Sequence, residues 1–149
     1  AIAWSGELRS SNLNATVSRD GTWDLTKIQS GTVEIDGDGH FDVDVEFTAL
    51  LRDVTRQYSL SYDATYAGVQ VQLLPPAVVG GTVQYSVQAE RKASGPRRES
   101  DASFDMQAEL TFGRNASATL TLDGKYQYAV NTSSGQVAKM GSVSVDARP

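Results

Sequence analysis

The chain has 149 residues, with 13 Lys and Arg against 18 Asp and Glu, a formal net charge of −5, and no cysteine. This acidic balance disfavours nucleic acid and anionic lipid as partners, because both attract basic surfaces. The lack of cysteine excludes disulfides, thiolate metal sites and thiol nucleophiles, and no apolar run approaches the ~20 residues of a membrane helix.

The chain begins Ala1-Ile2-Ala3-Trp4, without an initiator Met. We expect either that a signal segment has been removed or that the sequence starts within a longer protein. The segment is mildly apolar, so it could complete the sheet of a neighbouring subunit by strand addition.

Hydrophobic residues at alternate positions dominate the first half of the chain, most clearly from Phe41 to Phe47, where Val alternates with Asp and Glu. This period of two predicts a half-buried strand with an acidic outer face. Asp20-Gly21 predicts a turn before Trp23, and the stretch from Asp36 to Gly39 predicts another before Phe41.

Asp36, Asp38 and Asp42 lie in an acidic cluster on this glycine-rich stretch. Hard cations bind six to eight oxygen ligands, so these carboxylates are candidate ligands for Ca²⁺, although their spacing differs from that of an EF-hand loop. The alternative is a solvated face that protects a strand edge. His40, the one histidine, is interpreted as an exposed turn residue.

Gly21-Thr22-Trp23 is followed by Ser30-Gly31-Thr32-Val33 and the glycine-rich turn. This order resembles lipocalins and avidins, which carry Gly-x-Trp on an early barrel strand. The resemblance implies a closed barrel with an interior ligand pocket. The later tryptophans of an avidin pocket are missing from this sequence, so no family is assigned.

The second half repeats the alternation between turn signals. Leu73 to Pro76 ends one group of strands, because two prolines do not fit a central strand. Gly80-Gly81, Asp123-Gly124 and Ser134-Gly135 predict further turns, and the charged stretch from Glu90 to Asp101 predicts a long hairpin tip, either solvated or in contact with an anionic partner.

The two halves could be related. Gly31-Thr32-Val33 and Gly81-Thr82-Val83 are each expected to open a hairpin, with return strands at 40–48 and 103–111 that share Phe-Asp, Glu and Thr at matching offsets. Coincidence between alternating strands is the other explanation. The sequence therefore predicts one all-β domain over residues 1–149, an antiparallel, jelly-roll-like β-sandwich of about ten strands, with possible halves 1–74 and 77–149.

Two further sets of residues are candidates for binding and for modification. Exposed aromatic side chains could stack on sugars or contact a protein partner; the candidates are Trp4, Trp23, Tyr58 and Tyr62. Three of the four asparagines stand in Asn-x-Ser/Thr, the acceptor motif for glycosylation, which also arises by chance in a chain rich in Ser and Thr; these are Asn14, Asn115 and Asn131.

No motif for a nucleophile, a phosphate loop or a set of metal-binding histidines is found in the sequence. We therefore expect a non-enzymatic structural or adhesive module, extracellular, on a cell surface or periplasmic. It would bind protein subunits or a glycan, without a cofactor apart from the candidate Ca²⁺. The alternative is a calycin-like barrel for a small apolar ligand.

Overall fold

A computed structural model describes residues 1–28, 31–49, 54–96 and 99–142, and in these the chain is all-β and antiparallel, as predicted. No helix in the described segments is long and apolar enough to span a bilayer. The nine strands are β1 (Ile2–Arg9), β2 (Leu13–Thr26), β3 (Thr32–Ala49), β4 (Val54–Leu73), β5 (Pro76–Ser94), β6 (Ser100–Phe112), β7 (Ser117–Leu122), β8 (Tyr126–Asn131) and β9 (Val137–Ser142).

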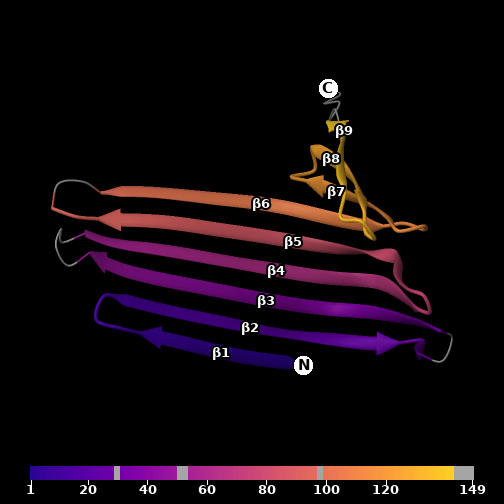
Figure 1. Cartoon of the computed structure of the whole chain (residues 1–149), viewed down its shortest axis with the longest axis horizontal. Helices are drawn as coiled ribbons and strands as arrows, with labels where there is room; N and C mark the ends of the chain where they lie inside the picture. The colour runs from indigo at the N-terminus through magenta and orange to yellow at the C-terminus, as the bar shows by residue number, and fades with distance from the viewer. Residues whose placement is uncertain (29–30, 50–53, 97–98, 143–149) are drawn as a thin grey trace, which may run out of the picture. The chain divides into compact units, whose positions relative to one another are not determined.

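The strands form one open sheet in which their order is their order along the chain (Figure 1). The described strands give neither the second layer of a sandwich nor the crossover of a jelly roll. The closed barrel suggested by Gly21-Thr22-Trp23 would require the first and last strands to pair, and in this order β1 and β9 are the two edges.

Two of the predicted turns are wrong, because strands run through them. Asp20-Gly21 lies inside β2, and the stretch from Asp36 to Gly39 lies inside β3. The carboxylates of Asp36 and Asp38, which would bond to their own backbone in a turn, accept hydrogen bonds from β4 instead.

The hairpin expected to open at Gly31-Thr32-Val33 is also wrong, since residues 32–49 form one strand without reversal. Gly80-Gly81, predicted as a turn, lies inside β5. His40 is consequently a strand residue and not a turn residue. The division into halves 1–74 and 77–149 stays a prediction.

The predicted tip from Glu90 to Asp101 is shorter than expected, because Glu90 to Ser94 belong to β5, Ser100 and Asp101 belong to β6, and residues 97–98 lie outside the described residues. The other turn signals are confirmed. Asp123 and Gly124, with φ of 49° and 64°, reverse the chain in the three-residue connection between Leu122 of β7 and Tyr126 of β8. The Lys125 N–H donates to the Leu122 carbonyl and closes the turn. Gly135, with φ of 72°, lies between β8 and β9. The peptide bond between Leu74 and Pro75 is cis, and β4 ends just before it.

The chain divides into two compact units. Unit 1 comprises residues 1–22, 39–63 and 86–105, and unit 2 comprises residues 23–38, 64–85 and 106–149. Strands β2 to β6 contribute residues to both. The buried hydrophobic residues of the described chain all belong to unit 2: Ala64, Val69, Val83, Ala108 and Ala118.

In unit 1, side chains alternate between two faces of the sheet. Phe41 stacks on Tyr62 on one face, with 5.2 Å between ring centroids, whereas His40 bonds to Asp63 on the other. The first is called the apolar face; its large and charged residues are Ile2, Trp4, Leu8, Leu13, Val17, Arg19, Phe41, Val43, Val45, Phe47, Val54, Arg56, Tyr58, Leu60, Tyr62, Val87, Arg91 and Phe104. The second is called the polar face.

Unit 2 continues the alternation across a distortion in β4. Gly68 has φ of 55°. Thr65 before it and Gln70 beyond it both bond to carboxylates of β3, so the positions of β4 that face these carboxylates change from odd-numbered to even-numbered residues at Gly68. This change of phase is that of a β-bulge, which adds one residue to one strand. Gly81 of β5, with φ of 95°, lies directly against the backbone of Gly68 and Val69.

Candidate functional site

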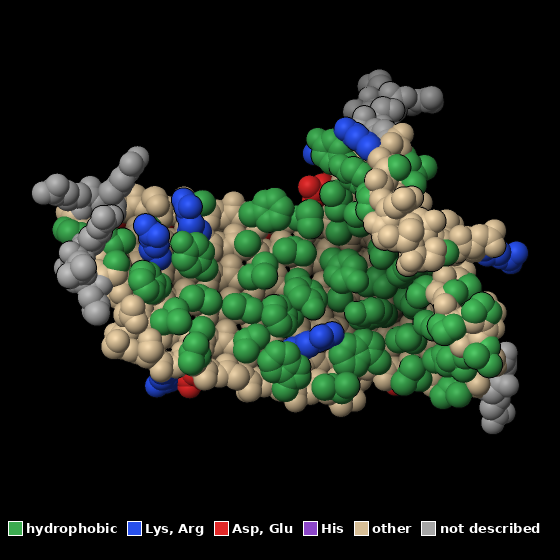
Figure 2. All heavy atoms as spheres, in the orientation of Figure 1, with side chains coloured by type: hydrophobic (Ala, Val, Ile, Leu, Met, Phe, Trp, Pro, Cys, Tyr) green, Lys and Arg blue, Asp and Glu red, His purple; other side chains and the backbone are tan. Residues whose placement is uncertain are grey.

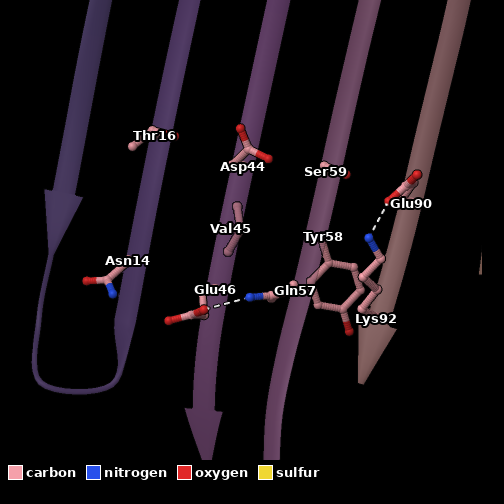
Figure 3. Close-up of a pocket in the computed structure, with 10 residues that line it drawn as sticks. All are labelled: Asn14, Thr16, Asp44, Val45, Glu46, Gln57, Tyr58, Ser59, Glu90 and Lys92. Atoms are coloured by element: carbon pink, nitrogen blue, oxygen red, sulfur yellow. Dashed lines mark hydrogen bonds and ion pairs between the residues drawn. The ribbon is translucent and has the colours of Figure 1, made fainter. Parts of the chain in front are cut away.

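The polar face of unit 1 has a shallow depression of about 430 Å³, which Figure 3 shows in close-up. Strands β2 to β5 line it with residues of the polar face, Asn14, Thr16, Asp44, Glu46, Gln57, Ser59, Glu90 and Lys92. Val45 and Tyr58, which alternate to the apolar face and also line the groove there, border the depression as well. This mixture of amide, hydroxyl and carboxylate groups can hydrogen-bond a polar ligand such as a glycan.

Several of these side chains are already paired with one another (Figure 3). Gln57 Nε2 donates to Glu46 Oε2 over 2.8 Å, and Lys92 Nζ lies 2.9 Å from Glu90 Oε2. The hydrogen bond from Lys92 to Glu90 raises the pKa of the Lys92 ammonium group above its ordinary value. Both groups of the ion pair remain in contact with solvent, so a ligand can replace either partner at little cost.

His40 lies between two aspartates on this same face. Its Nδ1 is 2.5 Å from Asp63 Oδ1 and its Nε2 is 2.5 Å from Asp42 Oδ2. Hydrogen bonding to Asp63, and then to Asp42, raises the pKa of His40, because both bonds favour the imidazolium form, in which each ring nitrogen donates. The ring is thereby fixed in orientation on an exposed surface.

The predicted cation ligands do not converge on one point. Asp36 Oδ1 accepts a hydrogen bond of 2.7 Å from the Gly68 backbone N–H, and Asp38 Oδ1 accepts one of 2.9 Å from Thr65 Oγ1, both within unit 2. Asp42 belongs to unit 1, where it bonds to His40. Among the described residues, no group of three or more His, Cys, Asp or Glu side chains is arranged to hold a metal ion.

The predicted aromatic residues divide between the two units. Trp4 and Tyr58 are exposed on the apolar face of unit 1, by 49% and 42%, and Tyr62 is half-buried beside Phe41. Trp23 belongs to unit 2, where it meets Tyr66 edge-on with 6.3 Å between ring centroids. Trp4, Tyr58 and Tyr62 therefore share a face, and Trp23 belongs to a separate aromatic pair.

The apolar face of unit 1 holds a second hollow of about 580 Å³, a groove with walls from β3, β4, β5 and β6. The lining residues on the apolar side of the strands are hydrophobic apart from one arginine: Val43, Val45, Tyr58, Leu60, Ala89, Arg91, Ala102 and Phe104. Ser59, Glu90 and Ser103, which alternate to the polar face, also line the groove. Figure 2 shows the same character more widely, with hydrophobic side chains over β1 to β6 and Lys or Arg at isolated points among them.

Sequence reasoning missed Arg19 and Arg56 of this face, and it considered Arg91 only within the charged stretch from Glu90 to Asp101. Arg19, Arg56 and Arg91 occupy positions that the alternation assigns to the hydrophobic side of β2, β4 and β5. The signal was present in the sequence, since each lies two residues from a hydrophobic residue on the same strand. That the three arginines share one face depends on the register of β2, β4 and β5 in the sheet, which no local pattern specifies.

The three acceptor asparagines are exposed. Asn14 lines the depression on the polar face, and Asn115 has φ of 60° between β6 and β7. Asn131 Oδ1 accepts hydrogen bonds from Ser133 and Ser134, which fixes its side chain at the turn after β8. Glycosylation at these positions stays a prediction.

Comparison with known proteins gives no matching family model, no similar curated protein and no similar solved structure.

Proposed function

We propose that the protein is a non-enzymatic module of an extracellular or cell-surface assembly, joined to a second copy of itself by strand addition at β1. The observation that carries this proposal is the edge position of β1. Its eight residues all pair with β2, and among the described strands none lies on its other side. Such an edge presents backbone donors and acceptors that another strand can pair with.

The side chains of β1 suit such a join. Ile2, Trp4 and Leu8 lie on the apolar face and are exposed by 62%, 49% and 58%. Two copies paired through antiparallel β1 strands would place these residues beside their counterparts and continue the apolar face from one copy to the next. On the polar face, Arg9 forms an ion pair with Glu7, so the edge carries no net charge that would repel a second copy.

The burial of the side chains supports a non-enzymatic role. No polar or charged side chain is buried in the described part of the chain. Catalytic acids and bases usually depend on burial or on like-charge neighbours to shift their pKa toward the working pH. The one histidine is held between two aspartates on an exposed surface, and each of its ring nitrogens is bonded to one of them.

Proline substitution at two consecutive positions of β1 tests the join. Alternate residues of an antiparallel strand direct their N–H groups toward the same neighbour, so Ser5→Pro and Gly6→Pro remove one donor toward β2 and one toward the free edge. Mass is measured by light scattering and stability by urea unfolding. We expect one variant to keep its stability and become monomeric.

The other variant, which loses a bond to β2, is the matched control. It should unfold at a lower urea concentration than the native chain. A native protein that is monomeric at all concentrations, or two proline variants that both assemble like the native chain, would contradict the proposal.

A further inference from the structure

We propose that the apolar face of unit 1 docks on the surface of a lipid bilayer that contains anionic headgroups. This surface includes the side chains of Ile2, Trp4 and Leu8 on β1, whereas the proposed join between copies uses the backbone groups of the β1 edge. Three features of unit 1 support docking: its hydrophobic side chains are exposed, the charges among them are positive, and its strand carboxylates lie on the opposite face.

The hydrophobic side chains of this face are uncovered. No residue of unit 1 is buried in the described structure, and Phe104 of β6, at the groove, is 55% exposed. Tyr58 and Leu60, also in the groove, are exposed by 42% and 39%. Continuous exposed hydrophobic surface of this kind marks a site of interaction with a protein or a membrane.

The charges on the two faces of unit 1 differ in sign. Arg19, Arg56 and Arg91 lie exposed on the apolar face, and no ion pair engages them within the described structure. Every carboxylate in the described strands of unit 1 is on the polar face: Glu7, Asp20, Asp42, Asp44, Glu46, Asp63, Glu90, Asp101 and Asp105.

This segregation changes what the net charge implies. A chain of net charge −5 is expected to avoid an anionic membrane. The carboxylates that produce this charge in unit 1 point away from the apolar face, and a surface potential decays within a Debye length of about 8–10 Å. A bilayer approached by the apolar face therefore meets arginines first.

The arginines also argue against a second copy as the cover of this face. Two apolar faces packed together would enclose Arg19, Arg56 and Arg91 of both copies, and neither face carries a strand carboxylate to pair with them. Buried charge without a partner is strongly unfavourable. At a bilayer, each guanidinium group can extend along its aliphatic stem to a phosphate while the neighbouring hydrophobic side chains enter the acyl region.

Trp4 provides the most specific element of the fit. It lies directly opposite Arg19 in the β1–β2 register, so an indole ring and a guanidinium group stand side by side on the exposed face. Trp and Tyr concentrate at the boundary between headgroups and acyl chains, because their rings are apolar with one polar group. Tyr58 offers a second such ring on β4.

Vesicle sedimentation tests the proposal with two double variants. Arg19→Glu/Arg91→Glu reverses two charges of the apolar face of unit 1. Arg114→Glu/Lys125→Glu reverses two exposed charges of unit 2, in the connections after β6 and β7, with the same change in net charge. The vesicles contain phosphatidylcholine alone or with phosphatidylglycerol. Far-ultraviolet circular dichroism verifies that each variant is folded.

We expect the native chain to bind the vesicles with phosphatidylglycerol and the Arg19/Arg91 variant to bind them at least roughly tenfold more weakly. The Arg114/Lys125 variant should bind nearly as well as the native chain. Equal weakening of both variants, or no binding by the native chain at any vesicle concentration, would overturn the proposal.

A fluorescence measurement keeps the proposal testable if charge reversal prevents folding. The chain has two tryptophans, so Trp23→Phe leaves Trp4 as the reporter. Trp4 emission should shift to shorter wavelength on addition of anionic vesicles and be quenched by brominated acyl chains. Unchanged Trp4 emission would overturn docking through this face. Vesicle binding that occurs only when another protein is added would overturn it as well.

Discussion

Units 1 and 2 share the same alternating strands but differ in whether their hydrophobic side chains are covered. Unit 2 contains all five buried hydrophobic residues of the described chain, and unit 1 contains none. Three of the five are alanines, and register explains one of them: Ala118 of β7 lies between Phe112 of β6 and Val130 of β8. Alternation thus predicts which face is hydrophobic, but not whether that face is covered.

The glycines should show the largest contrast between the units. Gly81→Ala places a Cβ against the backbone of Gly68 and Val69 at a φ of 95°, so we expect a loss of about 3 kcal/mol or more in the free energy of unfolding. Gly6→Ala in unit 1 meets only a Val17 methyl group at 3.5 Å, an ordinary contact. Its free energy of unfolding should change by less than about 1 kcal/mol.

Urea unfolding of the two variants and the native chain gives this comparison directly. Equal losses of unfolding free energy in both variants would show that the close approach of Gly81 to Gly68 and Val69 adds no cost for a Cβ at this position.

Truncation of one valine in each unit should give a smaller contrast. Val83 of unit 2 is 2% exposed, so Val83→Ala should lower the free energy of unfolding by about 2 kcal/mol through lost burial and the cavity left behind. Val43 of unit 1 is half-buried and lines the groove, so Val43→Ala should cost less than about 1 kcal/mol. Thermal unfolding of both variants in dilute protein measures the difference.

Addition of anionic vesicles sharpens the same comparison. If the apolar face of unit 1 enters a bilayer, Val43→Ala should weaken vesicle binding, whereas Val83→Ala should not. The reverse order would contradict the assignment of the exposed face to unit 1.

Much of the strand content was predictable from residues that alternate, such as Phe41 to Phe47, and the hairpin at Asp123-Gly124 was predictable from its positive-φ residues. The long strands were not, because Asp36 and Asp38 are indistinguishable in sequence from turn residues. Only the structure shows that their carboxylates bond to Gly68 and Thr65 across the sheet. The single sheet was also not predictable, because alternating residues indicate a hydrophobic face but do not indicate what covers it.

The candidate sites were predictable in part for a related reason. Trp4 and Tyr58 were found because aromatic residues at alternate positions are visible in a sequence. The pairing of His40 with Asp63 depends on the register of β3 against β4, which no local pattern specifies. Arg19 and Arg91 gain significance only once the carboxylates of neighbouring strands are known to face the other way.

The smallest expected effect concerns pH and is confined to unit 1. Because hydrogen bonds to Asp63 and Asp42 raise the pKa of His40, the folded state binds this proton more tightly than the unfolded state, whose pKa is near 6.5. The resulting stabilisation is fully present below the unfolded pKa and is lost as the pH rises through the higher folded pKa. Since the ring is exposed, solvent screening keeps this contribution small.

His40 is the one histidine, so its ring protons can be followed by nuclear magnetic resonance without assignment. Asp63→Asn should lower the pKa of His40 most, Asp42→Asn should lower it less, and Asp44→Asn, which removes a carboxylate of the same strand and face that is not bonded to the ring, should leave it nearly unchanged. A native pKa at or below 6.5 would show that neither aspartate holds the imidazolium ring. A stability maximum well above the native pKa of His40 would show that other groups of unit 1 set the pH dependence.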